Sequence, residues 1–149
     1  MPDVSLIQMA AILSEVVTRS EENTRRGLED AARLVKREAK TELGYYQEAI
    51  GPLPAWAELA DSTKDERVRQ GYTENDPGLR SGQMRDSIEH TVEGHEAHIG
   101  SDDENLVFFE LGTTKQPPRP VLAGSLMRRS QDVAQIIGGR YFGRLNGDG

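Results

Sequence analysis

The sequence predicts an α+β fold in which a long N-terminal helix and a C-terminal helix pack on a small antiparallel β-sheet. Apolar residues recur at spacings of three and four over residues 3–43 and again over 120–137, as in helices with one buried face. Polar and apolar residues alternate over residues 84–100 around a central glycine, which predicts a β-hairpin. The length of 149 residues is close to the commonest size of one domain. We therefore expect a single domain over 1–149, with an N-terminal helical segment (1–44), a connection with a short helix (45–78), a hairpin and C-terminal helix core (79–137) and a tail (138–149).

The N-terminal helical pattern contains a polar interruption. Residues 18–24 are all polar and separate two apolar stripes. A straight helix over 3–43 would be about 60 Å long at 1.5 Å per residue, which exceeds the width of a small domain. Either the helix breaks near Ser20, giving two ordinary amphipathic helices, or one long or kinked helix contacts a neighbouring molecule. Gly44 is placed to end the helix in a left-handed conformation.

The connection between this helix and the hairpin contains the only tryptophan, Trp56. We expect Trp56 to anchor the connection to the core, because a buried indole removes a large apolar area from water. A short helix is predicted over residues 63–70. Thr63 and Glu66 have the spacing of a capping box, and Gly71 follows the helix.

The hairpin is predicted as a strand over residues 84–93, a turn at Gly94 and a second strand over 96–100. Met84, Ile88 and Val92 would share one face of the first strand, and Ala97 and Ile99 the inward face of the second. His90 falls on the apolar face. The three histidines, His90, His95 and His98, do not converge on this hairpin, so we expect no metal site there.

Residues 106–111 form a compact apolar run that fits either a strand or one to two helical turns. Within it, Glu110 lies between Phe109 and Leu111. A buried carboxylate requires a partner, and Arg119, Arg80 or Arg85 could provide one; alternatively, Glu110 points to water from an alternating strand. Gly112 permits a turn with positive φ.

A loop is predicted over residues 113–118, followed by a helix that starts at Pro120 and continues to about Ile137. Gly138 and Gly139 are expected to stop this helix. In the remaining tail, Tyr141, Phe142 and Leu145 are apolar enough to add a strand or to dock on a neighbour.

Composition and motifs argue against an enzyme. The chain has no cysteine, which excludes disulfides, thiolate nucleophiles and cysteine-based zinc sites. It contains no G-x-S-x-G nucleophile motif and no phosphate-binding glycine loop, and the acidic residues 102–104 lack the spacing of a calcium loop. No secretory signal or apolar run long enough to span a membrane is visible. We expect no enzymatic activity, cofactor, metal or membrane contact.

Three linked motifs run through residues 78–126 in a fixed order. Together with an upstream group around Trp56, they comprise Trp56, Leu59, Thr63, Leu79, Ser81, Gly82, Met84, Arg85, Ser87, Ile88, Gly100, Ser101, Glu110, Gly112, Thr113, Arg119, Pro120 and Leu122. This ordered set resembles the tail-completion, or head–tail joining, proteins of the neck of tailed bacteriophages, of the minor tail protein type. The likeness covers residues 56–126. The chain departs from the family pattern at Phe108, Val121 and Ala123-Gly124, which affects the subfamily assignment more than the family.

The resemblance implies an α+β virion protein that forms a homo-oligomeric ring, a hexamer or dodecamer, at the neck or top of the tail. Its partners would be a head-closing connector and a tail-tube or terminator protein. It would be assembled in the bacterial cytoplasm, and DNA would pass through the ring without specific binding. The net charge of −7 suits such a passage, because a negative wall repels phosphates. The residues assigned to contacts between subunits or rings, because they lack an internal role, are Thr113, Thr114, Lys115, Gln116, Pro117, Pro118, Arg140, Tyr141, Phe142 and Leu145.

Two alternatives remain open at the level of sequence. One is a tail terminator or another minor tail or capsid accessory protein. The other is a nucleic-acid-binding module that uses arginines clustered toward the C-terminus, namely Arg119, Arg128, Arg129, Arg140 and Arg144. An acidic chain is a poor general binder of nucleic acid, because affinity for DNA comes mainly from basic residues that neutralise phosphates.

Overall fold

The computed structural model describes the backbone of residues 21–145 and the side chains of residues 22–139. Its elements are α2 (Glu21–Glu42), α3 (Asp61–Arg69), α4 (Gln83–Asp86), β1 (Glu89–Glu93), β2 (Glu96–Gly100), α5 (Glu104–Leu111), α6 (Val121–Arg128) and α7 (Ser130–Leu145). The predicted α+β class is confirmed. Residues 3–20 of the predicted N-terminal helix, and the possible break near Ser20, lie outside the described residues.

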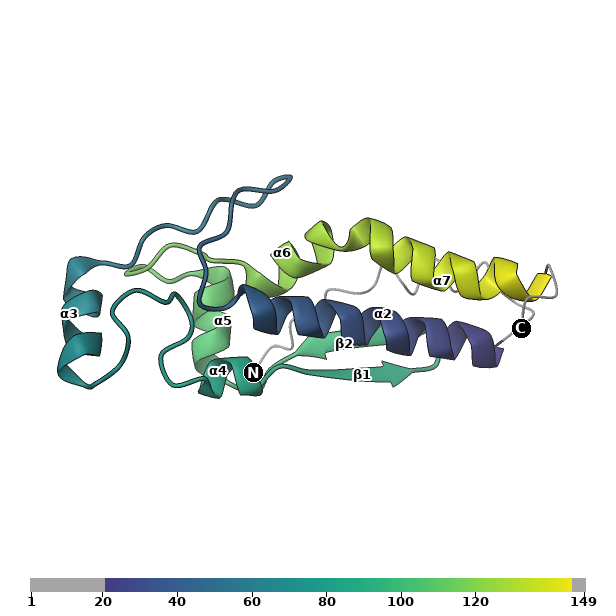
Figure 1. Cartoon of the computed structure of the whole chain (residues 1–149), viewed down its shortest axis with the longest axis horizontal. Helices are drawn as coiled ribbons and strands as arrows, with labels where there is room; N and C mark the ends of the chain where they lie inside the picture. Colours follow the sequence, from purple (N-terminus) through teal and green to yellow (C-terminus); the bar gives the residue numbers. More distant parts are fainter. Residues whose placement is uncertain (1–20, 146–149) are drawn as a thin grey trace.

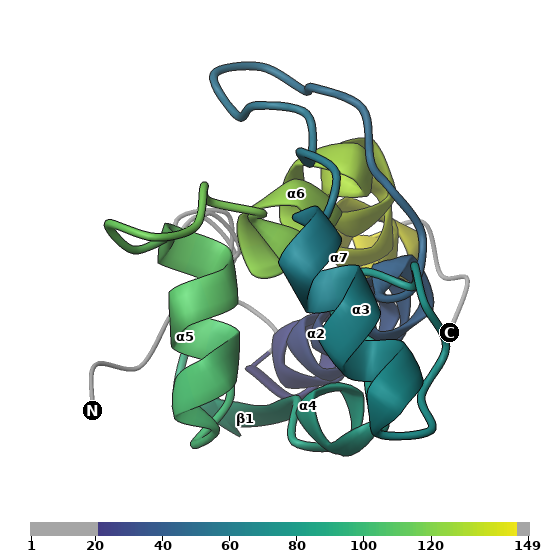
Figure 2. The ribbon, with the colours of Figure 1, turned by 90° about the vertical axis from the view of Figure 1, so that its left-hand side faces the viewer.

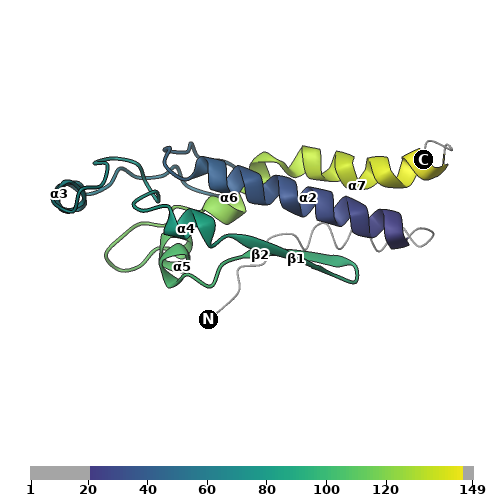
Figure 3. The same ribbon diagram turned by 60° about the horizontal axis from the view of Figure 1, so that its bottom comes forward.

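Helix α2 is the central element. It lies between the hairpin and α7 in two views of the molecule (Figures 1 and 3) and contacts β1, β2, α6 and α7. The predicted second apolar stripe forms its buried face: Leu28, Ala32, Val35, Ala39 and Leu43 are at most 2% exposed. The predicted stop is confirmed as well, since Gly44 has a φ of +99° and its N–H donates to the Pro77 carbonyl at 2.7 Å.

The hairpin is antiparallel, and its register pairs Glu89 with Gly100 and Glu93 with Glu96. Ala97 and Ile99 are fully buried against α2, as predicted. The first strand was predicted too long, because residues 83–86 form the helical turn α4 instead. The N–H of Asp86 donates to the Gly82 carbonyl, and the Ser87 hydroxyl donates to the Met84 carbonyl at 2.6 Å. These local bonds compete with strand pairing and close the turn before Ile88 reaches the core.

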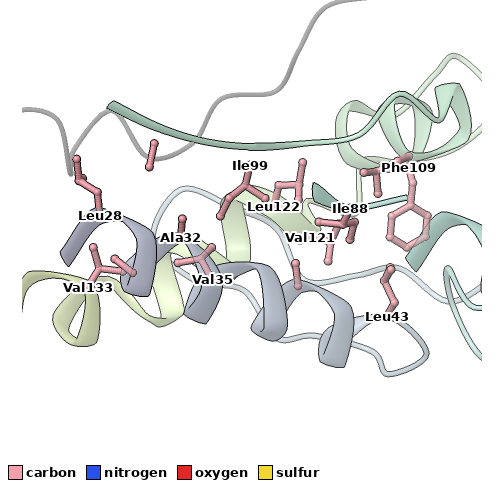
Figure 4. Close-up of a cluster of buried hydrophobic side chains, with 14 of the residues drawn as sticks. Leu28, Ala32, Val35, Leu43, Ile88, Ile99, Phe109, Val121, Leu122 and Val133 are labelled. Carbon is pink, nitrogen blue, oxygen red and sulfur yellow. The ribbon is translucent and has the colours of Figure 1, made fainter. Parts of the chain in front are cut away.

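The core is a continuous apolar cluster beside α2 (Figure 4). Leu28, Val35, Ile99, Leu122 and Val133 are all fully buried in it. Each such side chain contributes roughly 1.5–3 kcal/mol on removal from water. The core therefore joins α2, the hairpin, α6 and α7 into one body.

Two helix boundaries differ from the sequence prediction. The C-terminal helix breaks at Arg129 into α6 and α7, and it does not stop at Gly138-Gly139 but continues to Leu145. Each helical glycine costs about 1 kcal/mol relative to alanine, and packing of Val133 and Ile137 against the core offsets that cost. The short helix α3 was predicted, but its capping box was wrong: the N-cap is Ala60, which has no side-chain cap.

Candidate functional site

The motif residues gather at the end of the molecule that carries α3, α4 and α5. Figure 2 looks directly at this end, where α5, α3 and α4 surround the tip of α2. Two loops extend from it: the connection that follows α2, and the loop that follows α5. This end is the candidate functional site.

Glu110 is the buried carboxylate that holds this end together. It lies on α5, since residues 106–111 are helical, and it is 4% exposed. Its Oε2 accepts the N–H of Leu122 at 2.8 Å, and its Oε1 accepts the N–H of Ala123 at 2.9 Å. Both predicted alternatives, an arginine partner and a solvent-facing strand position, are wrong. The carboxylate caps the N-terminus of α6, where helical N–H groups have no partner of their own.

The electrostatics of this cap are unfavourable for ionisation. Burial raises the pKa of the Glu110 carboxyl above its ordinary value, although hydrogen bonds from the first N–H groups of α6 act in the opposite direction. Pro120, the N-cap residue of α6, makes no side-chain cap of its own. Glu110 therefore supplies from a different helix what the local sequence lacks.

Arg119 and Trp56 fasten the connection to the same point. The Arg119 guanidinium donates to the carbonyls of Ala57 at 2.9 Å and Glu58 at 3.2 Å, and it lies over the ring of Phe109. Trp56 is 5% exposed and meets the Phe109 ring edge-on at 5.2 Å between centroids. The anchoring role predicted for Trp56 is confirmed.

The loop over residues 113–118 is an ordered turn with a polar, exposed surface. The N–H of Thr113 donates to the Gln116 carbonyl at 2.9 Å, and the N–H of Lys115 donates to the Thr113 hydroxyl at 3.1 Å. Gly112 starts the loop with a φ of +76°, and a Cβ there would lie 2.7 Å from the Pro118 nitrogen. The predicted positive φ is confirmed. All six loop residues are exposed except the half-buried Gln116.

The first two motif pieces also meet. The hydroxyls of Ser87 and Ser101 lie 2.6 Å apart, which joins the end of α4 to the end of β2. Gly82 is the N-cap residue of α4, and Arg85 on that helix pairs with its neighbour Asp86 at 3.1 Å. Arg85 is thus a local surface residue and not a partner of Glu110.

The C-terminal residues assigned to contacts do not form a separate tail. Arg140, Tyr141, Phe142 and Leu145 belong to α7, so the predicted extra strand is wrong. Their side chains lie outside the described ones, and their role in docking stays a prediction.

The histidines of the hairpin are separated by their own partners. His90 contacts Glu29 of α2 at 2.7 Å, and His98 contacts Glu96 at 3.1 Å. Over residues 21–145, no group of histidines and carboxylates is arranged to hold a metal ion. In the same range, no helix is long and apolar enough to cross a membrane.

Sequence reasoning missed two buried charged groups. Arg67 of α3 is 4% exposed and donates from Nη1 to the Asp76 carbonyl at 2.8 Å. Glu42 of α2 is equally buried and pairs with Arg128 at 2.7 Å. Neither had a signal in the sequence, because charged residues near helix ends are usually solvated and only the tertiary fold covers these two.

No protein-family model matches the chain, and neither does any curated protein or solved structure.

Proposed function

We propose that this chain is a structural, non-enzymatic virion protein that forms a ring at the neck of a tailed phage, between the head connector and the tail. The motif set that resembles tail-completion proteins is the origin of the proposal. One structural observation supports it most. The motif residues Glu110, Arg119 and Trp56 act within the chain, where they hold together the end from which two loops extend.

The exposed loop over residues 113–118 has the properties of a docking element. Its internal hydrogen bonds, its own prolines Pro117 and Pro118, and Pro120 just after it reduce the conformational entropy lost on association. Lys115 is its charged residue and is exposed on a chain with a net charge of −7. Such a cation would be attracted to acidic residues on a second copy, and a heterologous ring contact joins two different surfaces of the same chain.

The nucleic-acid alternative is the weaker one for a specific reason. Three of its five arginines are engaged inside the molecule: Arg119 with carbonyls, Arg128 with Glu42, and Arg129 with Glu38 and Asp132. Arginines held in this way are poorly available for phosphates, whose neutralisation provides most DNA affinity.

Electron microscopy tests the proposal. The purified full chain is imaged alone and after mixing with head and tail particles of the virus that encodes it. A closed ring in solution, or added density at the head–tail junction, is the expected result. A monomer that joins neither particle but binds duplex DNA at physiological salt would contradict the proposal.

The loop itself is tested by Lys115→Glu. We expect this charge reversal to weaken ring formation or particle binding at least about tenfold, the effect of losing one favourable charge contact and gaining a repulsive one. Arg37→Glu is the matched control, because Arg37 is exposed on α2, away from the loop. Mass photometry over a concentration series measures both variants. Equal association by Lys115→Glu and the wild type would show that the loop is not the contact.

A further inference from the structure

A cleft with a positive lining opens at the candidate functional site. It has a volume of about 420 Å³ and lies between α3, the segment that leads into α4, and α5. Its charged lining residues are Arg67, Arg80, Arg119 and Asp103. These four residues give the cleft a local net charge of +2, which is opposite in sign to the net charge of −7 of the whole chain.

Two of these arginines are buried, at 4% exposure for Arg67 and 3% for Arg119. The described hydrogen bonds of Arg119 and Arg67 go to backbone carbonyls, which carry no full negative charge. Burial accordingly lowers the pKa of both groups. Burying a charge is costly unless it is paired, and an anion in the cleft would reduce that cost.

Arg67 has a specific unused group. Its hydrogen bond to Asp76 uses Nη1, while its Nε is buried and has no partner among the described residues. The edge of a guanidinium formed by Nε and Nη2 is suited to a bidentate bond with a carboxylate. A donor that is buried and unused beside a cleft is a feature that an incoming ligand can satisfy.

The other residues that line the cleft indicate which chemical groups of a ligand would fit beside the arginines. Leu59, Met84, Phe108 and Phe109 give the cleft an apolar wall, and Phe108 is 45% exposed. Asp103 would repel a phosphate, which carries up to two negative charges on one group, more than a carboxylate group, which carries one. The lining therefore favours an acidic group carried on aliphatic carbon.

We propose that this cleft binds a carboxylate on a short aliphatic stem, such as the end of a glutamate side chain, through Arg67 and Arg80 with Arg119 nearby. Arg80 is the adjustable member of the set. Its side chain is 41% exposed, lies over the Tyr72 ring and pairs only loosely with Glu66 at 3.6 Å. It can turn toward a ligand without disturbing the core. The site does not depend on the proposed ring, because a free organic acid or an acidic protein segment could supply the group.

The test is a titration of the full chain with glutarate, followed by NMR through the Nε–H resonance of Arg67. Sodium chloride at matched ionic strength and neutral glutaramide are the controls. We expect a saturable shift of this resonance with a dissociation constant on the order of millimolar, as befits so small a ligand. No shift, or an equal shift with glutaramide, would overturn the proposal. Tighter binding of inorganic phosphate than of glutarate would overturn the carboxylate assignment.

A pair of variants separates binding from general screening. Arg80→Gln is chosen because Arg67 is buried and its replacement could prevent folding. We expect Arg80→Gln to weaken glutarate binding about tenfold, as the loss of a charge-assisted hydrogen bond would. Arg69→Gln, on the exposed side of the same helix α3 and outside the cleft, should leave binding unchanged. Equal weakening by both variants would contradict a defined site.

Dilution of the protein without ligand identifies the source of the natural carboxylate. If the Arg67 resonance moves with protein concentration and glutarate reverses the association, a second copy supplies the group. If the resonance is independent of concentration but responds to glutarate, the group comes from another molecule. Both results support the carboxylate site. The site is tested separately from the ring, because glutarate should still bind if the protein proves not to form a ring.

Discussion

At the residue scale, the most consequential group is Glu110. Its two oxygens accept two N–H groups at the start of α6, so a single side chain couples α5 to α6. Burial raises the pKa of the Glu110 carboxyl, so keeping the ionised carboxylate here costs desolvation free energy. The two hydrogen bonds to α6 offset part of that cost and fix the geometry. The motif residue is thus structural within the chain, and its chemistry is that of a cap.

Replacement of Glu110 tests this role. In Glu110→Gln, the amide NH2 group faces an N–H donor, so one bond is lost and a buried donor is left unsatisfied. We expect a loss of about 1–3 kcal/mol in the free energy of unfolding, and a larger loss for Glu110→Ala. Urea denaturation measures both. Glu104→Gln is the control on the exposed first turn of α5 and should cost only a few tenths of a kcal/mol. Equal losses for Glu110→Gln and Glu104→Gln would refute the cap.

At the element scale, the C-terminal helices show how packing overrides propensity. Two adjacent glycines predict a stop at residue 138, yet α7 continues through them. Among the described residues, a Cβ added at Gly138 or Gly139 would meet nothing within 4 Å. The helix therefore continues despite its glycines and gains nothing from their small size.

Alanine at these two positions should stabilise the protein. Gly138→Ala and Gly139→Ala each remove unfolded-state entropy at a helical position with open space, so we expect a gain of about 0.5–1 kcal/mol per substitution. Differential scanning calorimetry measures it. Gly112→Ala is the opposite control, because its φ of +76° and close approach to Pro118 predict destabilisation. A loss of stability at Gly138 would indicate that the helix ends there.

At the scale of the whole molecule, buried charge links helices that are far apart in sequence. Glu42 near the end of α2 pairs with Arg128 at the end of α6, and Arg128 also donates to the Glu48 carbonyl at 2.8 Å. Burial raises the pKa of Glu42 to about 7, with the attraction of Arg128 acting against this and repulsion from Glu38 adding to it. The stability of the whole fold should therefore depend on pH.

The sign of that dependence follows from the raised pKa. Because the folded-state pKa of Glu42 lies above the ordinary value of 4.5, its stabilising contribution is complete below pH 4.5 and is lost as the pH rises through about 7. At about 1.4 kcal/mol per pKa unit, the change is on the order of 3 kcal/mol. The raised pKa of Glu110 acts in the same direction. We expect the melting temperature to fall by several degrees between pH 5 and pH 8.

The contribution of Glu42 can be isolated with Glu42→Gln. This substitution keeps an oxygen acceptor for Arg128 and removes the titration, so the melting temperature should vary less with pH. Glu22→Gln, on the exposed face of α2 with a side chain that is 60% exposed, should retain the wild-type dependence. A wild-type melting temperature that rises from pH 5 to pH 8 would contradict the raised pKa of Glu42.

The sequence by itself determined the elements that depend on local patterns. Periodicity predicted the buried face of α2, alternation predicted the Ala97/Ile99 strand, and glycine predicted the positive φ at residues 44 and 112. The surface pairs Glu22–Arg26 and Glu29–Arg33 also follow from their spacing on one helix, and both are formed. These features need only near neighbours, and so a single sequence contains the information for them.

Only the tertiary structure decided the partners of buried charge. Glu110 accepts hydrogen bonds from the N-terminus of α6 and not from an arginine, and Arg119 donates to two carbonyls of the connection. Arg67 becomes a buried residue beside a cleft. The physical reason is that desolvation and cross-element hydrogen bonds depend on which surfaces the core brings together. Local sequence places a charge on an element, and packing between elements determines whether water, a backbone or another charge surrounds it.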